Sequence, residues 1–146
     1  MSACVVRVVD ALPQVLLTRR GIDPHKGMWD FPGGYLENGE LPEAGLAREL
    51  EEELGVRIAR PRLFSLGIDE YPRDDVAEEA RFVLSIYYRC DIPADVPLAA
   101  ADDVAEAAWF PLNQPPGRMA FVSNRRALDE LRAAWEAESR QAPASG

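Results

Sequence analysis

Apolar runs separated by polar breaks predict a set of short strands. Residues 5–9 form a β-branched run, and residues 15–18 return after a turn at 10–13. Three further strand candidates follow residue 55: 56–68 (interrupted by Pro61), 81–89 and 105–110. The segments between these runs carry Gly, Pro and charged residues that favour loops.

Two segments have helical spacing instead. In residues 42–54, Pro42 suits the first helical position and Gly55 suits a left-handed terminator, although Leu41 is a poor cap. The second helix is expected from 123 or 124 to about 138. One early and one late helix among strands predict an α/β fold, in which a mixed sheet lies between helices.

Length and composition fit a single domain. The chain has 146 residues and is 47% hydrophobic, which suffices for one core. We assign residues 1–140 to this domain and expect a flexible tail at 141–146. No apolar run is long enough to span a bilayer and the first residues lack a secretory pattern, so we expect a cytoplasmic protein without membrane contact. Cys4 and Cys90 lie in apolar runs, which predicts buried, reduced thiols.

Charge narrows the choice of partners. The chain has 25 acidic and 16 basic residues, and its net charge is −9. A surface of this sign repels the backbone of DNA or RNA, so we expect no nucleic acid partner. A small phosphorylated substrate is compatible with it if cations bridge substrate and protein. The last helix could close the core or form a dimer face, which leaves monomer and homodimer both open.

Acidic residues gather on one side of the first predicted helix. Successive helical residues turn by about 100°, so Glu49, Glu52 and Glu53 share a sector of similar width. Like charges at this spacing repel each other, and a bound Mg²⁺ would relieve the repulsion because it prefers carboxylate oxygens. The alternative is a solvated acidic face. A Gly33-Gly34 turn just before the helix lets backbone approach a ligand closely, which favours a site.

The stretch from Gly34 to Val56 resembles the Nudix box, written GX5EX7REUXEEXGU with U an aliphatic residue. Gly34 is followed after five residues by Glu40, and after seven more by residues 48–56, Arg-Glu-Leu-Glu-Glu-Glu-Leu-Gly-Val, so every specified position is met. Family-like runs at 16–20, 29–34 and 109–111 extend the resemblance to residues 4–138. The resemblance to this family, which includes MutT, implies an α/β/α sandwich. It also implies hydrolysis of nucleoside diphosphates linked to a further moiety.

The resemblance also implies roles for the box residues. The metal ligands would be Glu49, Glu52 and Glu53, with Mg²⁺ as cofactor and Mn²⁺ as a possible substitute. Arg48 would orient a carboxylate, and Glu40 and Gly55 would be structural. A box glutamate such as Glu53 would take the proton of the attacking water.

A carboxylate outside the box is the alternative base. Some family members use a glutamate shortly before the late Trp-Phe pair, and Asp103 lies six residues before Trp109, beside Asp102 and with Glu106 closer. Aspartate has a shorter reach than the usual glutamate. A solvated loop end is the other interpretation of Asp103.

Substrate choice depends on the loops, where the sequence says less. Gly33, Gly34, Arg19 and Arg20 are the substrate-binding candidates. Pro72, sixteen residues past Val56, resembles a marker of the ADP-ribose-cleaving subgroup, although an ordinary turn proline would look the same. We therefore favour ADP-ribose or a nucleotide sugar. The alternatives are pyrophosphohydrolysis of a modified nucleoside triphosphate and, in another class, a non-catalytic nucleotide-sensing or protein-binding domain.

Overall fold

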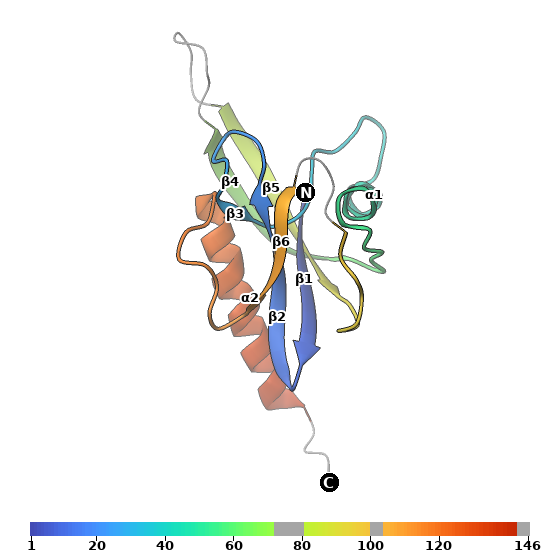
Figure 1. Ribbon diagram of the computed structural model, residues 1–146, viewed down its shortest axis with the longest axis vertical. Coiled ribbons are helices and arrows are strands. Elements are labelled where there is room, and N and C mark those ends of the chain that lie inside the picture. Colours follow the sequence, from blue (N-terminus) through green and yellow to red (C-terminus); the bar gives the residue numbers. More distant parts are fainter. Residues whose placement is uncertain (72–80, 100–103, 143–146) are drawn as a thin grey trace.

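A computed structural model describes residues 1–71, 81–99 and 104–142, the side chains of 104 and 105 excepted. Six strands and two helices follow one another along the described chain (Figure 1). Their bounds are β1 Ser2–Val9, β2 Leu12–Arg20, β3 Trp29–Asp30, α1 Pro42–Leu54, β4 Arg62–Tyr71, β5 Arg81–Asp91, β6 Val104–Pro111 and α2 Val122–Gln141.

The described strands form one mixed sheet. Its order is β3-β2-β1-β5-β4, and β6 pairs with β2. The pairing of β1 with β5 is parallel, with Val5 opposite Cys90, and the other pairings are antiparallel. This arrangement confirms the predicted α/β class with a mixed sheet.

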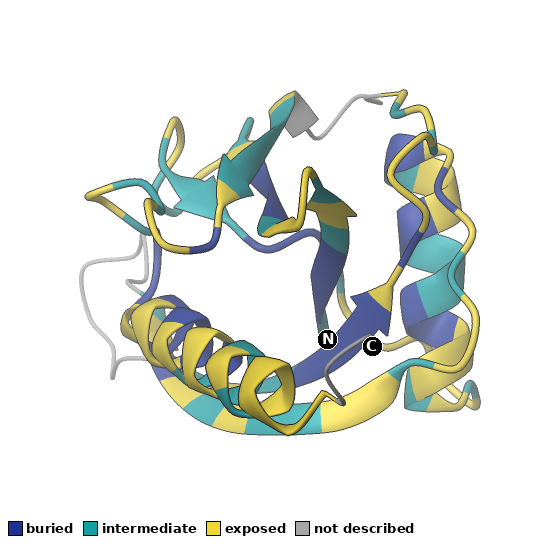
Figure 2. Ribbon diagram, turned by 90° about the horizontal axis from the view of Figure 1, so that it is seen from below, coloured by how far each residue is buried: buried dark blue, intermediate teal, exposed yellow. Residues whose placement is uncertain are grey.

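The two helices cover opposite faces of the sheet (Figure 2). Successive residues of a strand point to opposite faces, so β1 contributes to both cores. Val5 belongs to the core beneath α1, whereas Cys4 and Val6 belong to the core beneath α2. The apolar side of each helix completes its core: Leu46, Leu50 and Leu54 of α1, and Ala127, Leu128 and Leu131 of α2. The predicted sandwich is therefore confirmed. Both cysteines are buried and free, as expected.

Helix α1 has the predicted bounds. Leu41 makes no side-chain cap bond, while Gly55 adopts φ 64° and its N–H bonds the Glu51 carbonyl at 3.0 Å. Helix α2 continues to Gln141, beyond the predicted end, and residues 143–146 of the expected tail lie outside the described part. Neither described helix has the length and apolarity needed to cross a membrane.

The strand predicted at 56–68 is wrong at both ends. Strand β4 begins at Arg62 and continues to Tyr71. Val56 and Ile58 pack in the core beneath α1 rather than in a ladder. Arg60 then takes φ 51° and Pro61 has no N–H to donate, so regular pairing starts only after the proline.

Candidate active site

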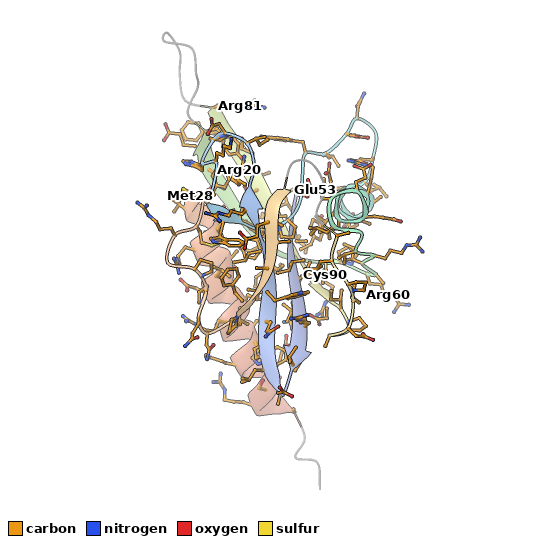
Figure 3. All side chains as sticks on the ribbon, viewed as in Figure 1. Arg20, Met28, Glu53, Arg60, Arg81 and Cys90 are labelled. Atoms are coloured by element: carbon orange, nitrogen blue, oxygen red, sulfur yellow. The ribbon has the colours of Figure 1, made fainter. Side chains whose placement is uncertain are left out.

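A pocket of about 620 Å³ opens between α1 and the sheet. Its lining includes Arg19, Arg20, Asp30, Gly33, Gly34, Glu49, Glu53 and Tyr71. The glutamates come from α1 and the arginines from the end of β2, as the labelled Arg20 and Glu53 show in Figure 3. The structure thus brings both predicted substrate arginines and two of the three predicted metal ligands to one pocket.

Glu49 rests on the backbone of the loop before α1. A methyl group at Gly34 would overlap the Glu49 carboxylate, so only glycine leaves room for it. The Met1 nitrogen donates to the Gly34 carbonyl at 2.8 Å and the Gly34 N–H donates to the Met1 carbonyl at 3.0 Å, which pins the loop to the start of β1. Burial raises the pKa of Glu49, and the neighbouring Arg48 acts in the opposite direction.

Arg48 gathers carboxylates on both sides of the turn that precedes α1. It donates to both oxygens of Glu40, at 3.2 and 2.8 Å, and to Glu49 at 3.1 Å and Glu52 at 3.2 Å. The bond with Glu40 raises the pKa of Arg48 and lowers that of Glu40. Glu40 also accepts the Glu37 N–H at 2.8 Å, so it joins the loop to the helix. Arg48 thus links Glu40 of the loop to Glu49 and Glu52 of the helix, while the orienting and structural roles stay predictions.

Glu52 lies apart from the other two predicted metal ligands. Its side chain is 60% exposed and bonds Arg48 rather than lining the pocket with Glu49 and Glu53. Within the described ranges, no three acidic, cysteine or histidine side chains are already grouped around a metal position. Mg²⁺ commonly binds through one or two carboxylates, several waters and substrate phosphates. The donor set formed by Glu49 and Glu53 fits that chemistry, and rotation of the exposed Glu52 side chain could extend it.

The two predicted substrate arginines have different surroundings. Arg19 is exposed and pairs with Glu106 at 3.1 Å. The Arg20 side chain is only 17% exposed; its Nε donates to the Pro24 carbonyl at 2.7 Å and its Nη1 to Asp30 at 3.0 Å. Glu106 is thus engaged on β6, while Asp103 and Asp102 lie outside the described residues, as does Pro72.

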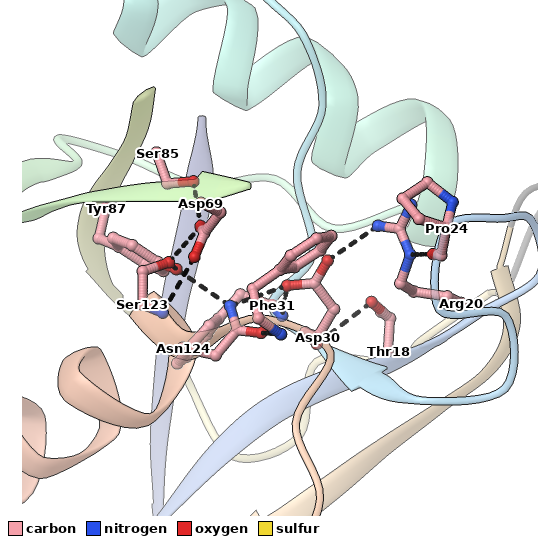
Figure 4. A network of polar contacts seen from close by, with 11 residues as sticks. Thr18, Arg20, Pro24, Asp30, Phe31, Asp69, Ser85, Tyr87, Ser123 and Asn124 are labelled. Atoms are coloured by element: carbon pink, nitrogen blue, oxygen red, sulfur yellow. Dashed lines mark hydrogen bonds and ion pairs between the residues drawn. The ribbon is translucent and has the colours of Figure 1, made fainter. Parts of the chain in front are cut away.

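A buried polar network beside the pocket was not predicted from the sequence (Figure 4). Asp30 accepts hydrogen bonds from Arg20, from the Phe31 N–H at 2.7 Å and from Asn124 at 3.1 Å. Asn124 also donates to the Tyr87 hydroxyl at 3.0 Å. The network then continues through Ser123, Asp69 and Ser85. An acidic residue between two aromatics that anchor the core is the one sequence signal that could have pointed to Asp30.

Aromatic side chains border the same end of the pocket. Tyr71 lines it and stacks on Phe121, with ring centroids 4.8 Å apart and planes 8° apart. Trp29 instead packs edge-on against Phe110 at 4.8 Å, and both rings adjoin the core beneath α2. Of these aromatics, Tyr71 is the one placed to meet a ligand.

The Nudix domain family matches residues 1–131 of the chain. The chain belongs to the Nudix family. It is 33% identical over 132 residues to the ADP-ribose pyrophosphatase of Methanocaldococcus jannaschii, covering 90% of this chain and 73% of that protein. It is 32% identical over 130 residues to a MutT-like protein of Streptomyces ambofaciens, covering 89% and 77%. Both the predicted family and the assignment as a Nudix hydrolase of phosphorus-containing anhydrides are confirmed.

Solved Nudix structures share the fold. The Nudix domain of Shewanella oneidensis NrtR, solved with ADP ribose, superposes with a TM-score of 0.71 at 20% identity, covering 92% of this chain and 85% of that one. A Caenorhabditis elegans Ap4A hydrolase gives 0.72 at 14% identity, covering 93% and 96%. At these identities the likeness concerns the fold alone.

Proposed function

We propose that this Nudix hydrolase cleaves the diphosphate of ADP-ribose or a nucleotide sugar in a Mg²⁺-dependent reaction. The observation that carries the proposal is the placement of Glu49 and Glu53 in one pocket with Arg20 and the Gly34 backbone. The pocket volume falls in the range of small-molecule sites, about 300–1,000 Å³. The name of the M. jannaschii relative, ADP-ribose pyrophosphatase, supports the choice of substrate.

Electrostatics explain why a cation belongs to the proposal. Carboxylates of α1 face the space that a diphosphate would occupy, and the chain carries a net charge of −9. Without a bridging metal, the negatively charged diphosphate and these carboxylates would repel each other. Bound Mg²⁺ would supply charge neutralisation of the diphosphate and a lower pKa for an attacking water.

The protein's own groups divide the remaining work. Glu49 and Glu53, with Glu52 after rotation, would hold the metal, and Arg48 would keep their carboxylates oriented. Arg19 and Arg20 would bind anionic or polar groups of the substrate. Glu53 would take the proton of the attacking water, with Asp103 as the alternative base.

A panel assay tests this function. ADP-ribose, nucleotide sugars and 8-oxo-dGTP would each be incubated with Mg²⁺, with Mn²⁺, and with a chelator. We expect a nucleoside monophosphate and a sugar phosphate from ADP-ribose, and no product with the chelator. The Glu52→Gln and Glu53→Gln variants should both lose turnover. Full turnover in both variants, or with the chelator, would contradict the metal-helix mechanism.

Shorter matches support a second candidate, hydrolysis of a modified nucleoside triphosphate. The 8-oxo-dGTP diphosphatase of Proteus vulgaris is 36% identical over 66 residues, which cover 44% of this chain and 59% of that protein. Product analysis separates the candidates, because this reaction releases pyrophosphate beside the monophosphate. Pyrophosphate from 8-oxo-dGTP, with ADP-ribose left intact, would favour the second candidate.

A further inference from the structure

Asp30 lines the pocket, and its largely buried carboxylate accepts three hydrogen bonds. Its side chain is 14% exposed. One oxygen accepts from Arg20, and the other accepts from the Phe31 N–H and from Asn124. Burial raises the pKa of Asp30, while the charge of Arg20 opposes that change most strongly. A charged group is kept in such surroundings only by partners of this kind.

Arg20 is held rigidly as a result. Its Nε bonds the Pro24 carbonyl, its Nη1 bonds Asp30, and its guanidinium carbon lies 5.1 Å from the centre of the Phe121 ring. Within residues 1–71, 81–99 and 104–142, the Nη2 group has no hydrogen-bond partner, and Arg20 lines the pocket. A planar guanidinium held at Nε and Nη1, with its Nη2 group available, suits recognition of a phosphate oxygen.

Asp30 also supports the aromatic ring beneath Arg20. Asn124 donates to Asp30 (Figure 4). It also accepts the Phe121 N–H at 2.9 Å, which fixes the residue just before α2. Phe121 in turn stacks against Tyr71 at the pocket wall. Asp30 therefore supports the guanidinium of Arg20 in two ways, directly through its carboxylate and indirectly through the Phe121 ring.

We propose that Asp30 is a positioning residue that orients the Arg20 guanidinium toward the substrate and thereby sets substrate affinity. The inference rests on the proposed function of this pocket. Asp30 and Arg20 come from the sheet, whereas the carboxylates that would serve the chemical step come from α1. Loss of Asp30 therefore weakens binding and leaves the hydrolytic step nearly unchanged.

A double-mutant cycle tests whether Asp30 acts through Arg20. Asp30→Asn should raise KM for ADP-ribose about tenfold, as expected when a hydrogen bond between charged groups is lost, and change kcat by less than about twofold. In an Arg20→Gln background the same change should alter KM by less than about twofold. Asp129→Asn, at an exposed carboxylate on α2, is the matched control and should leave both constants unchanged.

Two outcomes of the cycle would overturn the inference: an unchanged KM in Asp30→Asn, or an undiminished effect in the Arg20→Gln background. Arg20→Lys provides a second variant in case the Asp30→Asn protein does not fold. Lysine keeps the charge beside Asp30 but lacks the planar fork, so KM should rise by a similar factor. A wild-type KM for Arg20→Lys would also overturn the inference.

Calorimetric binding separates this inference from the proposed function. The dissociation constant for ADP-ribose is measured in a Glu53→Gln background with and without Asp30→Asn, and we expect a rise of about tenfold. If wild-type protein does not turn ADP-ribose over but the constant rises, only the proposed function fails. If turnover occurs and neither KM nor this constant changes, only the positioning role fails. Absence of both binding and turnover would overturn both.

Discussion

Replacing Gly34 with alanine tests whether the Glu49 carboxylate acts where the structure places it. The three atoms nearest to a Cβ at Gly34 would be the carboxyl carbon and both oxygens of Glu49, all at overlapping distances. Because these atoms end a flexible side chain, the carboxylate would yield rather than the backbone. A displacement on the order of 1 Å in an active site can reduce activity by about a hundredfold. We therefore expect kcat/KM for ADP-ribose with Mg²⁺ to fall by about 10- to 100-fold.

Two other glycines provide the comparison. A Cβ at Gly33 would overlap the backbone carbonyl of Met1, so Gly33→Ala should lower the unfolding temperature by several degrees. Gly117 has no described atom within 4 Å of such a Cβ, so Gly117→Ala should change neither stability nor activity. Initial rates over a range of ADP-ribose concentrations, together with thermal unfolding followed by circular dichroism, distinguish the three variants.

The result for Gly34→Ala decides between two interpretations of the helix. A folded variant with wild-type kcat/KM would refute a role for the Glu49 carboxylate at this position. The acidic side of α1 would then be interpreted as a solvated surface. A large loss of thermal stability would instead show that Gly34 serves the fold. Reduced turnover at nearly unchanged stability is the outcome that the geometry requires.

Three further outcomes are expected. Glu53→Gln should reduce kcat by orders of magnitude at unchanged stability, and single-turnover kinetics would show whether the hydrolytic step itself is slowed. The bond from Arg48 lowers the pKa of Glu40, so its stabilisation is present above the usual carboxyl pKa of about 4.3 and is lost as the pH falls through the lowered value. The difference in unfolding temperature between wild type and Glu40→Gln should therefore shrink on acidification, and a constant difference would argue against the bond. Glu138→Gln should lower the free energy of unfolding by about 1 kcal/mol, as measured by urea titration. The substitution weakens the bidentate contact of the half-exposed Glu138 with the buried Arg89.

Local patterns predicted the parts of the fold that depend on neighbouring residues. The bounds of α1 follow from Pro42 and Gly55, and its apolar side follows from a periodicity that the helix itself imposes. The start of β4 depends instead on how Val56 and Ile58 pack beneath α1, which is a tertiary contact. Apolar residues after Gly55 predict a strand equally well whether they pair or pack, so the prediction placed the strand too early.

In the candidate site, too, the residues that local sequence predicts differ from those that depend on tertiary contacts. Glu49 and Glu53 could be found because a helix fixes their relative directions within a few residues. The network around Asp30 could not be found in this way, because its partner Asn124 is 94 residues away and becomes a neighbour only when α2 docks on the sheet. The aromatic residues on either side of Asp30 hint at burial, but they do not identify its partners.

The structure also changes the physical reason for a cation at α1. From the sequence, a dication is expected because it would relieve repulsion between like charges on one sector of the helix. In the folded chain Arg48 already neutralises much of that repulsion, because it contacts Glu37, Glu40, Glu49 and Glu52 within 3.5 Å. The acidic helix is therefore compatible with a metal-free fold, and its stability is no evidence for a metal. The case for a cation rests instead on Glu49 and Glu53, which face the pocket where an anionic substrate would have to enter.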